Sequence, residues 1–495
     1  MGCIYLIIKL IGDGKINIEY TKSFMSMKKR GIDNTIMKKY ETIQITRLNE
    51  NLVKNIMSKR EIKEYKQMEM IVGNHRMRIN DDTYDGDQPF EYPIEHLKTK
   101  YKELQTETKK VLMCDGEIYN SDEIKKQEGF DEKDIQSNSD VEIIMPLYKK
   151  YGIIETIKKI RGEYNFILID NWNTLKYDEL NITICRDIFG SRSLYYVKDL
   201  QNFMYMFVSE LKGIPKHIKE NKKRYEIGEF PNGCIWNFEK EMLTNRNMVE
   251  FYKYDELKIP EIIYKRTDEE TLNKLYDEMY SKIEESIREK IPESKNISIF
   301  VDGNISSILI LVLLFKIDGI KIDIYTQVEN EMMIEKIKTI NKKMSNINIY
   351  IIKIGDEQDK QDEKIKEIIE TDKEEIIKSC IKYNNLCKYK KTMNKMRIIM
   401  LGYGLKLYYK NTNVEECIKT LNEENKMKYL NKIACYWDCE FRYPYMNKEI
   451  IQLILSIDGT LKKNIQVKEK EYTYYLIRKM MEIKIPEYKE IYYLV

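Results

Sequence analysis

Residues 180–196 read LNITICRDIFGSRSLYY, and this stretch shows the pattern that decides the fold of the first half of the chain. A short apolar run is followed by the turn residues FGSR at 189–192. Similar runs recur through the first 250 residues, separated by turn residues such as PNG at 231–233. Several strands with few helices predict a sheet-dominated, sandwich-like domain. The other runs are IYLIIKL (4–10), KKVLMCD (109–115), YNFILID (164–170) and FMYMFVSE (203–210).

Three further segments of this half carry expectations about local structure. Apolar residues recur at helical spacing in VEIIMPLYKKYG (141–152), which predicts one helix. DGE at 115–117 is expected to form a turn, because Asp and Gly favour turns. Residues 14–66 are polar and highly charged, so helices and surface are expected there.

The pattern changes from about residue 268. An amphipathic helix is predicted over 269–291, and NISIFVDGNISSILILVLLFK (296–316) predicts a strand, a turn and a helix. Strands are predicted at 321–327 and 346–355, with a helix over 328–344 between them. Strands that alternate with helices predict a parallel sheet covered by helices on both faces. Charged, helical sequence is expected from there to the C-terminus.

The chain has 495 residues, enough for two or three domains at roughly 100–200 residues each. We place the boundary near 245–265, which gives domains 1–245 and 246–495. Apolar residues make up 42% and charged residues 33%, a composition typical of a soluble globular protein. The 84 Lys and Arg against 81 Asp and Glu give a net charge of +3, so no nucleic acid is expected as a partner.

The nine cysteines are scattered and form no CxxC pair. Cys435 and Cys439 are close in sequence, but they have neither a second pair nor a nearby histidine, so no metal site is expected. Reduced thiols and a cytoplasmic location are expected instead. The three histidines are too few for a chemistry that needs several imidazoles.

No apolar run approaches the ~20 residues of a membrane span, so no membrane is expected as a partner. The opening run lacks the basic segment and cleavage site of a signal peptide. The start MGC resembles lipidated N-termini, but Leu6 stands where myristoylation needs Ser or Thr.

A set of short motifs in the first half offers the groups that an amide-hydrolysing site needs. A site that uses an N-terminal cysteine requires a thiol, a proton acceptor, donors for the oxyanion, and charges that hold the substrate. The motifs, in order, are MGCI (1–4), KRGID (29–33), HRMRIND (75–81), QP (88–89), DGEIYN (115–120), SDVEII (139–144), IRGEYNF (160–166), RDIFGSRSLYY (186–196), SELKG (209–213) and EFPNGC (229–234).

In this order the motifs resemble the glutaminase domain of the glutamine-hydrolysing asparagine synthetases, strongly to about residue 234 and weakly after 300. The resemblance implies a class II glutamine amidotransferase domain with an αββα sandwich of the N-terminal-nucleophile type. An α/β parallel-sheet adenylating domain of the ATP-pyrophosphatase type should follow. It also implies a ligase of asparagine biosynthesis, in which glutamine is hydrolysed through a cysteine thioester and ammonia meets a β-aspartyl-AMP made with ATP and Mg²⁺.

The resemblance implies roles for four residues of the first domain. Arg76 would pair with the α-carboxylate of glutamine, ideally through two parallel bonds. Glu117 and Asp140 would hold the α-ammonium, and the small Gly116 would let a backbone N–H approach the oxyanion. Simpler interpretations stay open, because an Arg in a loop is usually solvated and a Gly in DGE is usually only part of a turn.

Two departures from the family's motifs affect the chemistry. Ile4 keeps the family's register, so Gly2 takes the place of the nucleophile and Cys3 is displaced by one. One step along a strand turns the thiol to the other face. Asp115 replaces an asparagine of the oxyanion hole, and an ionised carboxylate donates no hydrogen bond. Losing one such donor typically costs ~2.7–4 kcal/mol of transition-state stabilisation.

The second half resembles the family's pyrophosphate loop and its later motifs only in part. FVDGNISS (300–307) keeps Gly303, Ser306 and Ser307, while Asp302 brings a carboxylate to the loop. An ordinary turn before a helix N-terminus explains these residues as well as nucleotide binding does.

Three further nucleotide-site residues are implied by the later motifs. LGYGLKL (401–407) keeps Gly402 and Gly404 but places Lys406 and Leu407 at the family's acidic pair. The segment 440–450 keeps Glu440, Arg442 and Pro444 of another motif. Near the end Arg478 is kept, while Tyr474 replaces a lysine.

Two functions follow as hypotheses. The first is a glutamine-dependent asparagine synthetase, with glutamine and aspartate as substrates and Cys3 as nucleophile. The second is a pseudoenzyme that keeps the fold as a binding or regulatory subunit, which the altered motifs favour. A homodimer or another protein partner is left open.

Overall fold

The structure is a computed structural model of a chain that divides into two compact units, Met1–Asp255 and Glu256–Val495. The predicted helix over 328–344 lies largely outside the described residues. The residues that the structure describes are 2–10, 18–41, 68–93, 109–172, 181–238, 252–253, 261–265, 268–327, 334–335, 338, 346–352, 358–393, 397–406, 426–462, 465–467, 470–472 and 474–492.

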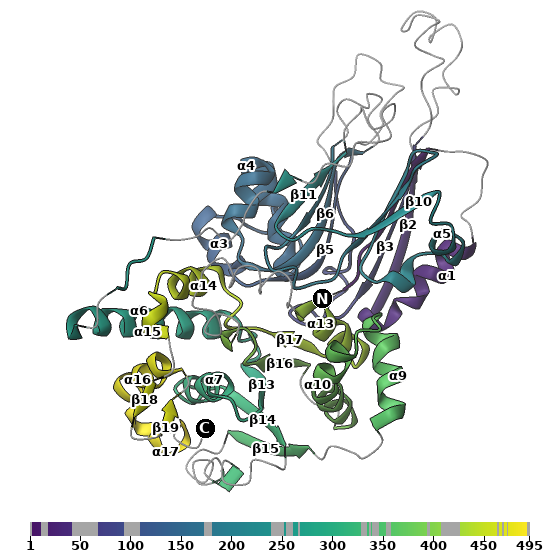
Figure 1. The fold of residues 1–495 in the computed structure, drawn as a ribbon. Coiled ribbons are helices and arrows are strands. Elements are labelled where there is room, and N and C mark those ends of the chain that lie inside the picture. Colours follow the sequence, from purple (N-terminus) through teal and green to yellow (C-terminus); the bar gives the residue numbers. More distant parts are fainter. Residues whose placement is uncertain are drawn as a thin grey trace, which may run out of the picture. The chain divides into compact units, whose positions relative to one another are not determined.

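The first unit is built on two six-stranded antiparallel sheets that face each other (Figure 1). The first sheet has the order β10 (Tyr225–Glu229), β8 (Tyr195–Asp199), β9 (Met204–Val208), β1 (Tyr5–Leu10), β3 (Met68–Arg76), β2 (Asn34–Glu41). The second has the order β12 (Tyr252–Lys253), β11 (Cys234–Asn237), β7 (Asn181–Arg186), β6 (Gly162–Trp172), β5 (Lys109–Ile118), β4 (Phe90–Pro93).

Alternating side chains of the strands separate three apolar layers, because successive residues of a strand point to opposite faces. Ile4, Leu6 and Ile8 belong to the core that both sheets share, together with Val111 and Ile167 on β5 and β6. The intervening residues of each strand belong to two outer cores, which the helices cover.

Helices close both outer faces of the sandwich. On the second sheet, Ile124 and Leu147 of α3 (Ser121–Glu128) and α4 (Ile144–Lys159) pack with Leu112 and Phe166. On the first sheet, Phe24 of α1 (Ile18–Ser26) packs with β1, and α5 (Lys216–Glu220) adds to the same core. The expected αββα sandwich is thereby confirmed. Short 3₁₀ turns are η1 (Lys28–Arg30), η5 (Asp140–Ile143) and η7 (Leu211–Gly213).

Two local expectations for this unit are wrong. Residues 34–41 form the edge strand β2 rather than a helix, because β3 supplies the partners of its backbone along the whole strand. Residues 115–117 form no turn and lie within β5, paired with β6. Gly116 stands opposite Tyr164, where a Cβ would lie 2.2 Å from the carbonyl oxygen of Glu163. The glycine therefore permits a close approach of two strands.

The second unit contains a five-stranded parallel sheet, as the alternating pattern predicts. Its order is β15 (Ile347–Ile352), β14 (Lys321–Gln327), β13 (Asn296–Val301), β16 (Ile398–Leu401), β17 (Glu440–Arg442). The last two strands and a small hairpin, β18 (Ile465–Val467) and β19 (Lys470–Tyr472), interrupt the region expected to be helical.

Helices cover both faces of this sheet. In Figure 1, α7 lies on one side with α6 and α16, and α9, α10 and α13 lie on the other. The helices are α6 (Glu269–Glu289), α7 (Ile305–Phe315), α9 (Gln358–Ile369), α10 (Glu374–Thr392), α13 (Met427–Tyr436), α14 (Lys448–Leu455), α15 (Gly459–Lys462), α16 (Tyr475–Lys484), η10 (Pro486–Tyr488) and α17 (Lys489–Tyr492).

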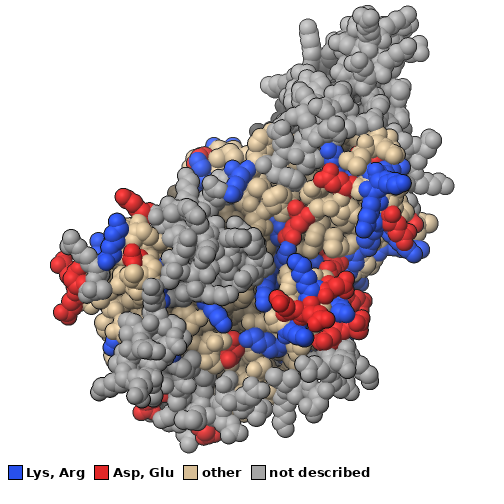
Figure 2. All heavy atoms as spheres, in the orientation of Figure 1, with Lys and Arg blue, Asp and Glu red and all other residues tan. Residues whose placement is uncertain are grey.

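The described surface mixes the two signs of charge. On the face drawn in Figure 2, Lys and Arg side chains are interspersed with Asp and Glu. Within the described ranges, none of the helices has the length and apolar character needed to cross a membrane.

We expect Trp236→Ala to lower the free energy of unfolding by about 3–5 kcal/mol, as removal of large buried aromatic side chains does. Trp236 is fully buried in the core between the two sheets and packs against Tyr205 and Phe207. Urea unfolding of the full chain measures the change. Ile154→Ala, at a half-exposed site on α4, is the control and should change stability by less than about 0.5 kcal/mol. Equal effects of the two variants would contradict the assignment of Trp236 to the core.

Candidate functional site

The start of the chain is fixed in the first sheet by its backbone. Gly2 forms an antiparallel bridge with Arg76 of β3. The N–H of Cys3 donates to the carbonyl oxygen of His75 at 3.0 Å, and the N–H of Ile4 donates to Ser209 Oγ at 2.8 Å. Both neighbouring strands, β3 and β9, therefore set the position of this segment.

The side chain of Cys3 points away from the space between the sheets. It belongs to the outer core with Tyr5, Phe24 and Met27, whereas Ile4 belongs to the core between the sheets. Cys3 is 0% exposed, and burial raises the pKa of its thiol well above the ordinary value despite the opposing effect of Arg30. The thiol is thus held neutral, and a neutral thiol is a poor nucleophile.

Gly2, which the resemblance predicts to stand in place of a nucleophile, has little room for a side chain. A Cβ there would lie 2.7 Å from the carbonyl oxygen of His75 and 3.2 Å from Asn74 Nδ2. The first distance is shorter than real Cβ contacts, so any side chain at position 2 would require either this segment or the backbone of β3 to shift.

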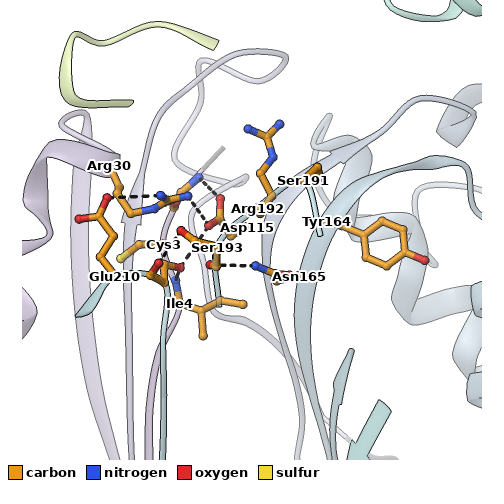
Figure 3. A network of polar contacts seen from close by, with 12 residues as sticks. Cys3, Ile4, Arg30, Asp115, Tyr164, Asn165, Ser191, Arg192, Ser193 and Glu210 are labelled. Atoms are coloured by element: carbon orange, nitrogen blue, oxygen red, sulfur yellow. Dashed lines mark hydrogen bonds and ion pairs between the residues drawn. The ribbon is translucent and has the colours of Figure 1, made fainter. Parts of the chain in front are cut away.

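A buried ion pair lies beside this segment. Arg30 of η1 and Asp115 of β5 point toward each other (Figure 3), with Nη2 and Oδ2 2.7 Å apart and both side chains 0% exposed. Asp115 Oδ1 accepts the N–H of Gly2 at 3.3 Å, and Oδ2 also accepts the hydroxyl of Ser209 at 3.2 Å. Both oxygens of the Asp115 carboxylate are therefore occupied by contacts within the protein.

The same arginine also contacts a second carboxylate and the first residues of the chain. Arg30 Nη1 lies 3.4 Å from Glu210 Oε1, and Nε donates to the carbonyl oxygen of Gly2 at 3.2 Å. Lys212 pairs with the other oxygen of Glu210 at 2.5 Å. The motifs KRGID and SELKG contain Arg30, Ser209 and Glu210, but no local pattern in the sequence indicates that these residues meet.

Four of the expected site residues, Arg76, Gly116, Glu117 and Asp140, line one small pocket of the first unit together with Asn80. Asn80 Nδ2 donates to Glu117 Oε2 at 2.8 Å and to Asp140 Oδ1 at 3.1 Å. The two carboxylates therefore converge on one donor group, and neither Gly2 nor Cys3 is among the residues that line this pocket.

Arg76 is held in position by the loop that follows it. Nη1 donates to the carbonyl oxygen of Thr83 at 2.6 Å and to Asp87 Oδ1 at 2.7 Å, while Nη2 donates to the carbonyl oxygen of Asp81 at 2.6 Å. Arg76 as a whole is 5% exposed, and its guanidinium is surrounded by these polar groups. A ligand carboxylate would share this cation with Asp87 or replace it.

In the second unit, the loop between β13 and α7 surrounds a carboxylate. Asp302 accepts the Ser307 hydroxyl at 2.8 Å, Asn304 Nδ2 at 2.8 Å and Lys382 Nζ at 3.0 Å. Burial raises the pKa of Asp302, but Lys382 and these hydrogen bonds outweigh it and hold the pKa below its usual value. Gly303 follows with φ +84°.

This donor set does not fit the phosphates of ATP with Mg²⁺, which the resemblance implies. The ionised Asp302 takes the hydroxyl and the ammonium that a phosphate would use, and it would repel a phosphate. Within the described ranges, three or more His, Cys, Asp or Glu residues nowhere gather as metal ligands.

The other expected nucleotide residues lie in the loop after β16 and on the helices α7 and α16. Gly402 follows β16 and abuts the start of α7, because a Cβ there would lie 2.7 Å from Ser307 N and 2.8 Å from Ser306 Oγ. Gly404 has φ +112°, and Arg478 lies on α16, which packs against α6. The structure thus brings Ser306, Ser307 and Gly402 together.

Residues 31–230 match the family model described as a glutamine amidotransferase domain. The first unit contains a glutamine amidotransferase domain. The matched range of this domain includes Arg76, Asp115, Gly116, Glu117 and Asp140, and it begins after Gly2, Cys3 and Arg30.

Curated relatives of the amidotransferase domain include asparagine synthetases. A probable asparagine synthetase [glutamine-hydrolyzing] of Acanthamoeba polyphaga mimivirus is 22% identical over 259 residues, 50% of this chain and 42% of the relative. The asparagine synthetase [glutamine-hydrolyzing] of Gallus gallus is 32% identical over 143 residues, 29% of this chain and 21% of the relative. The matches thus span less than half of each relative.

Two further similarities lie outside the asparagine synthetases. Amidase chry2 of Gibberella zeae is 31% identical over 125 residues, 25% of this chain and 16% of the amidase. A solved structure of glutamine phosphoribosylpyrophosphate amidotransferase from B. subtilis covers 71% of this chain and 81% of its own, at 14% identity and a TM-score of 0.34.

We expect Arg30→Met to lower the free energy of unfolding by about 3–5 kcal/mol, because it leaves the charge of Asp115 buried without its partner. Urea unfolding of the full chain measures the loss. The double variant Arg30→Met, Asp115→Asn should recover part of it, because the unpaired charge is then gone. Arg161→Met, which breaks an exposed pair with Glu123, is the control. A loss no greater than that of the control would refute the role of the buried pair.

A second prediction concerns His75, whose ring stacks on Phe24 with centroids 4.0 Å apart and lies 2.9 Å from the Phe24 carbonyl oxygen through Nε2. Burial lowers the pKa of His75 from 6.5 to about 4. Between pH 6.5 and pH 4 the imidazole binds a proton in the unfolded chain but not in the folded one. The contribution of His75 to the free energy of unfolding is therefore fully present above pH 6.5, and it falls by up to about 3 kcal/mol towards pH 4.

Urea unfolding between pH 7 and pH 4 measures this slope. His75→Gln should flatten it relative to the parent chain, because the variant lacks the buried imidazole. Parallel slopes for the parent chain and His75→Gln would contradict the prediction.

Proposed function

We propose that the amidotransferase domain binds glutamine in the pocket around Arg76, Glu117 and Asp140 and does not hydrolyse it. The observation that supports this proposal best is that the charged residues of the pocket lie apart from the Cys3 thiol. The pocket retains the charged residues, while Gly2 excludes a side chain and the Cys3 thiol faces the outer core.

The charges of the pocket suit a free α-amino acid. A guanidinium pairs with a carboxylate through charge-assisted bonds, and two carboxylates can hold an ammonium group. The amide of Asn80 now lies between Glu117 and Asp140, in the place where an α-ammonium would donate to both. A single ligand that carries both a carboxylate and an ammonium group would complement Arg76, Glu117 and Asp140 together.

The groups around Gly2 argue against amide hydrolysis. Acyl transfer requires a nucleophile and donors directed at the developing oxyanion. Burial suppresses the thiolate of Cys3, and Asp115 is a buried acceptor paired with Arg30. We therefore infer a binding or regulatory role for this domain.

A second candidate is asparagine synthesis from aspartate and glutamine with ATP, which the curated relatives favour. This function needs nucleotide phosphates at the loop before α7, where Asp302 opposes them. Release of pyrophosphate upon addition of aspartate, ATP and Mg²⁺ would favour this candidate over the first.

We expect titration calorimetry of the full chain to show binding of L-glutamine. Arg76→Ala and Asp140→Ala should each weaken binding by about tenfold or more, because each removes a charged hydrogen-bonding partner. Arg161→Ala removes an exposed arginine of the same domain and should leave the affinity unchanged. Equal affinities of Arg76→Ala and Arg161→Ala would place the ligand elsewhere.

The same protein should release no ammonia from glutamine above the rate of the buffer. Cys3→Ala should leave this result and the glutamine affinity unchanged, because the thiol lies outside the pocket. If the parent chain releases ammonia and Cys3→Ala abolishes this release, the proposal is wrong and the domain is a glutaminase.

A further inference from the structure

The loop that joins β3 to β4 contributes two polar side chains to the pocket proposed for glutamine. Asn80 Nδ2 donates to Glu117 Oε2 at 2.8 Å and to Asp140 Oδ1 at 3.1 Å. Near the other end of the loop, Asp87 Oδ1 accepts a hydrogen bond from Arg76 Nη1 at 2.7 Å. An amide and a carboxylate of the chain itself therefore contact the charged residues of the pocket.

The space left between these groups is small. The pocket encloses about 20 Å³, which holds roughly one water molecule. An amino acid has several times the volume of a water molecule, so it does not fit while the loop keeps this position. The groups that complement the pocket and the volume of a ligand therefore exclude each other.

The backbone of the loop also contacts the arginine of the pocket. Arg76 donates to the carbonyl oxygens of Thr83 and Asp81, each at 2.6 Å. A Cβ at Gly86 would lie 2.3 Å from Arg76 Nη2, so the glycine lets the backbone approach the guanidinium. Residues 82–85 are exposed, and displacement of this stretch would uncover no buried apolar side chain.

We propose that Asn80 and Asp87 form an internal ligand that glutamine displaces. Asn80 takes the place of the α-ammonium group, Asp87 takes the place of the α-carboxylate, and glutamine binds when the loop moves away from the pocket. This inference rests on the proposed glutamine site and adds the contact that regulates it. The affinity for glutamine is then lower than that of an open pocket by the fraction of molecules in which the loop is displaced.

The two internal groups predict which ligands compete with them. A free α-amino acid carries an ammonium group and a carboxylate, so it replaces both Asn80 and Asp87. Glutaramate, the analogue of glutamine that lacks the α-amino group, replaces only Asp87 and leaves Asn80 between its two carboxylates. The inference therefore predicts that the two ligands respond differently to substitution of Asn80.

The test is titration calorimetry of the full chain with L-glutamine and with glutaramate. Asn80→Ala should tighten binding of L-glutamine by about tenfold, because the ammonium group no longer competes with an amide, and should leave the affinity for glutaramate unchanged. Asp87→Asn should tighten binding of both ligands by about tenfold, because the ligand carboxylate no longer competes for Arg76. Asp82→Asn is the matched control, since it removes an exposed carboxylate of the same loop that does not line the pocket, and it should change neither affinity.

Hydrogen exchange of the unmodified chain tests the loop without any variant. Saturating L-glutamine should speed exchange of the backbone amides of residues 81–87, because the loop leaves its contacts with Arg76. A ligand that bound beneath a loop in its present position would slow this exchange. Slower or unchanged exchange upon glutamine binding would therefore overturn the internal ligand.

The outcomes separate the internal ligand from the glutamine site itself. If Arg76→Ala weakens glutamine binding while Asn80→Ala and Asp87→Asn match the parent chain, the internal ligand is wrong and the site stands. If Asn80→Ala tightens both ligands equally, Asn80 is not the counterpart of the ammonium group. If Arg76→Ala leaves the affinity unchanged, or if neither the parent chain nor the two variants bind glutamine, the site is wrong and the internal ligand with it.

Discussion

The buried contact between Arg30 and Asp115 determines the geometry of the amidotransferase domain at its critical end. Asp115 belongs to one sheet, while the groups that it binds, Arg30, Ser209 and the backbone of Gly2, belong to the other sheet or to the turn beside it. Breaking either partner leaves a buried charge, so the pair is fixed once the sandwich has formed. The first residues of the chain are consequently held by the protein itself.

Both units contain a carboxylate that is paired with a cation from a helical segment. Asp115 pairs with Arg30 in the first unit, and Asp302 pairs with Lys382 in the second. Ser209 and Ser307 add a hydroxyl to each carboxylate. In the pocket, Glu117 and Asp140 instead share the amide of Asn80.

Much of the fold could be predicted from the sequence. Alternating strands and helices after residue 268 gave the parallel sheet, and short apolar runs gave the sandwich. Strand β2 was not predicted, because this edge strand is stabilised by pairing with β3 and needs little apolar content of its own. DGE at 115–117 was misjudged because turn preferences are local, whereas β6 imposes a strand on these residues.

The pocket residues were predictable through ordered motifs, but the network around them was not. Arg30 and Asp115 are 85 positions apart, and Arg30 and Glu210 are 180 apart, so no local pattern connects them.

The crowding at Gly2 has a consequence for how such a chain can change over time. The carbonyl of His75 that excludes a Cβ belongs to β3, whose neighbours on both sides are β1 and β2. A side chain at position 2 would force either this segment or the facing backbone of β3 to shift. The identity of residue 2 is therefore tied to the packing of the whole sheet, and a substitution there would need matching changes in its surroundings.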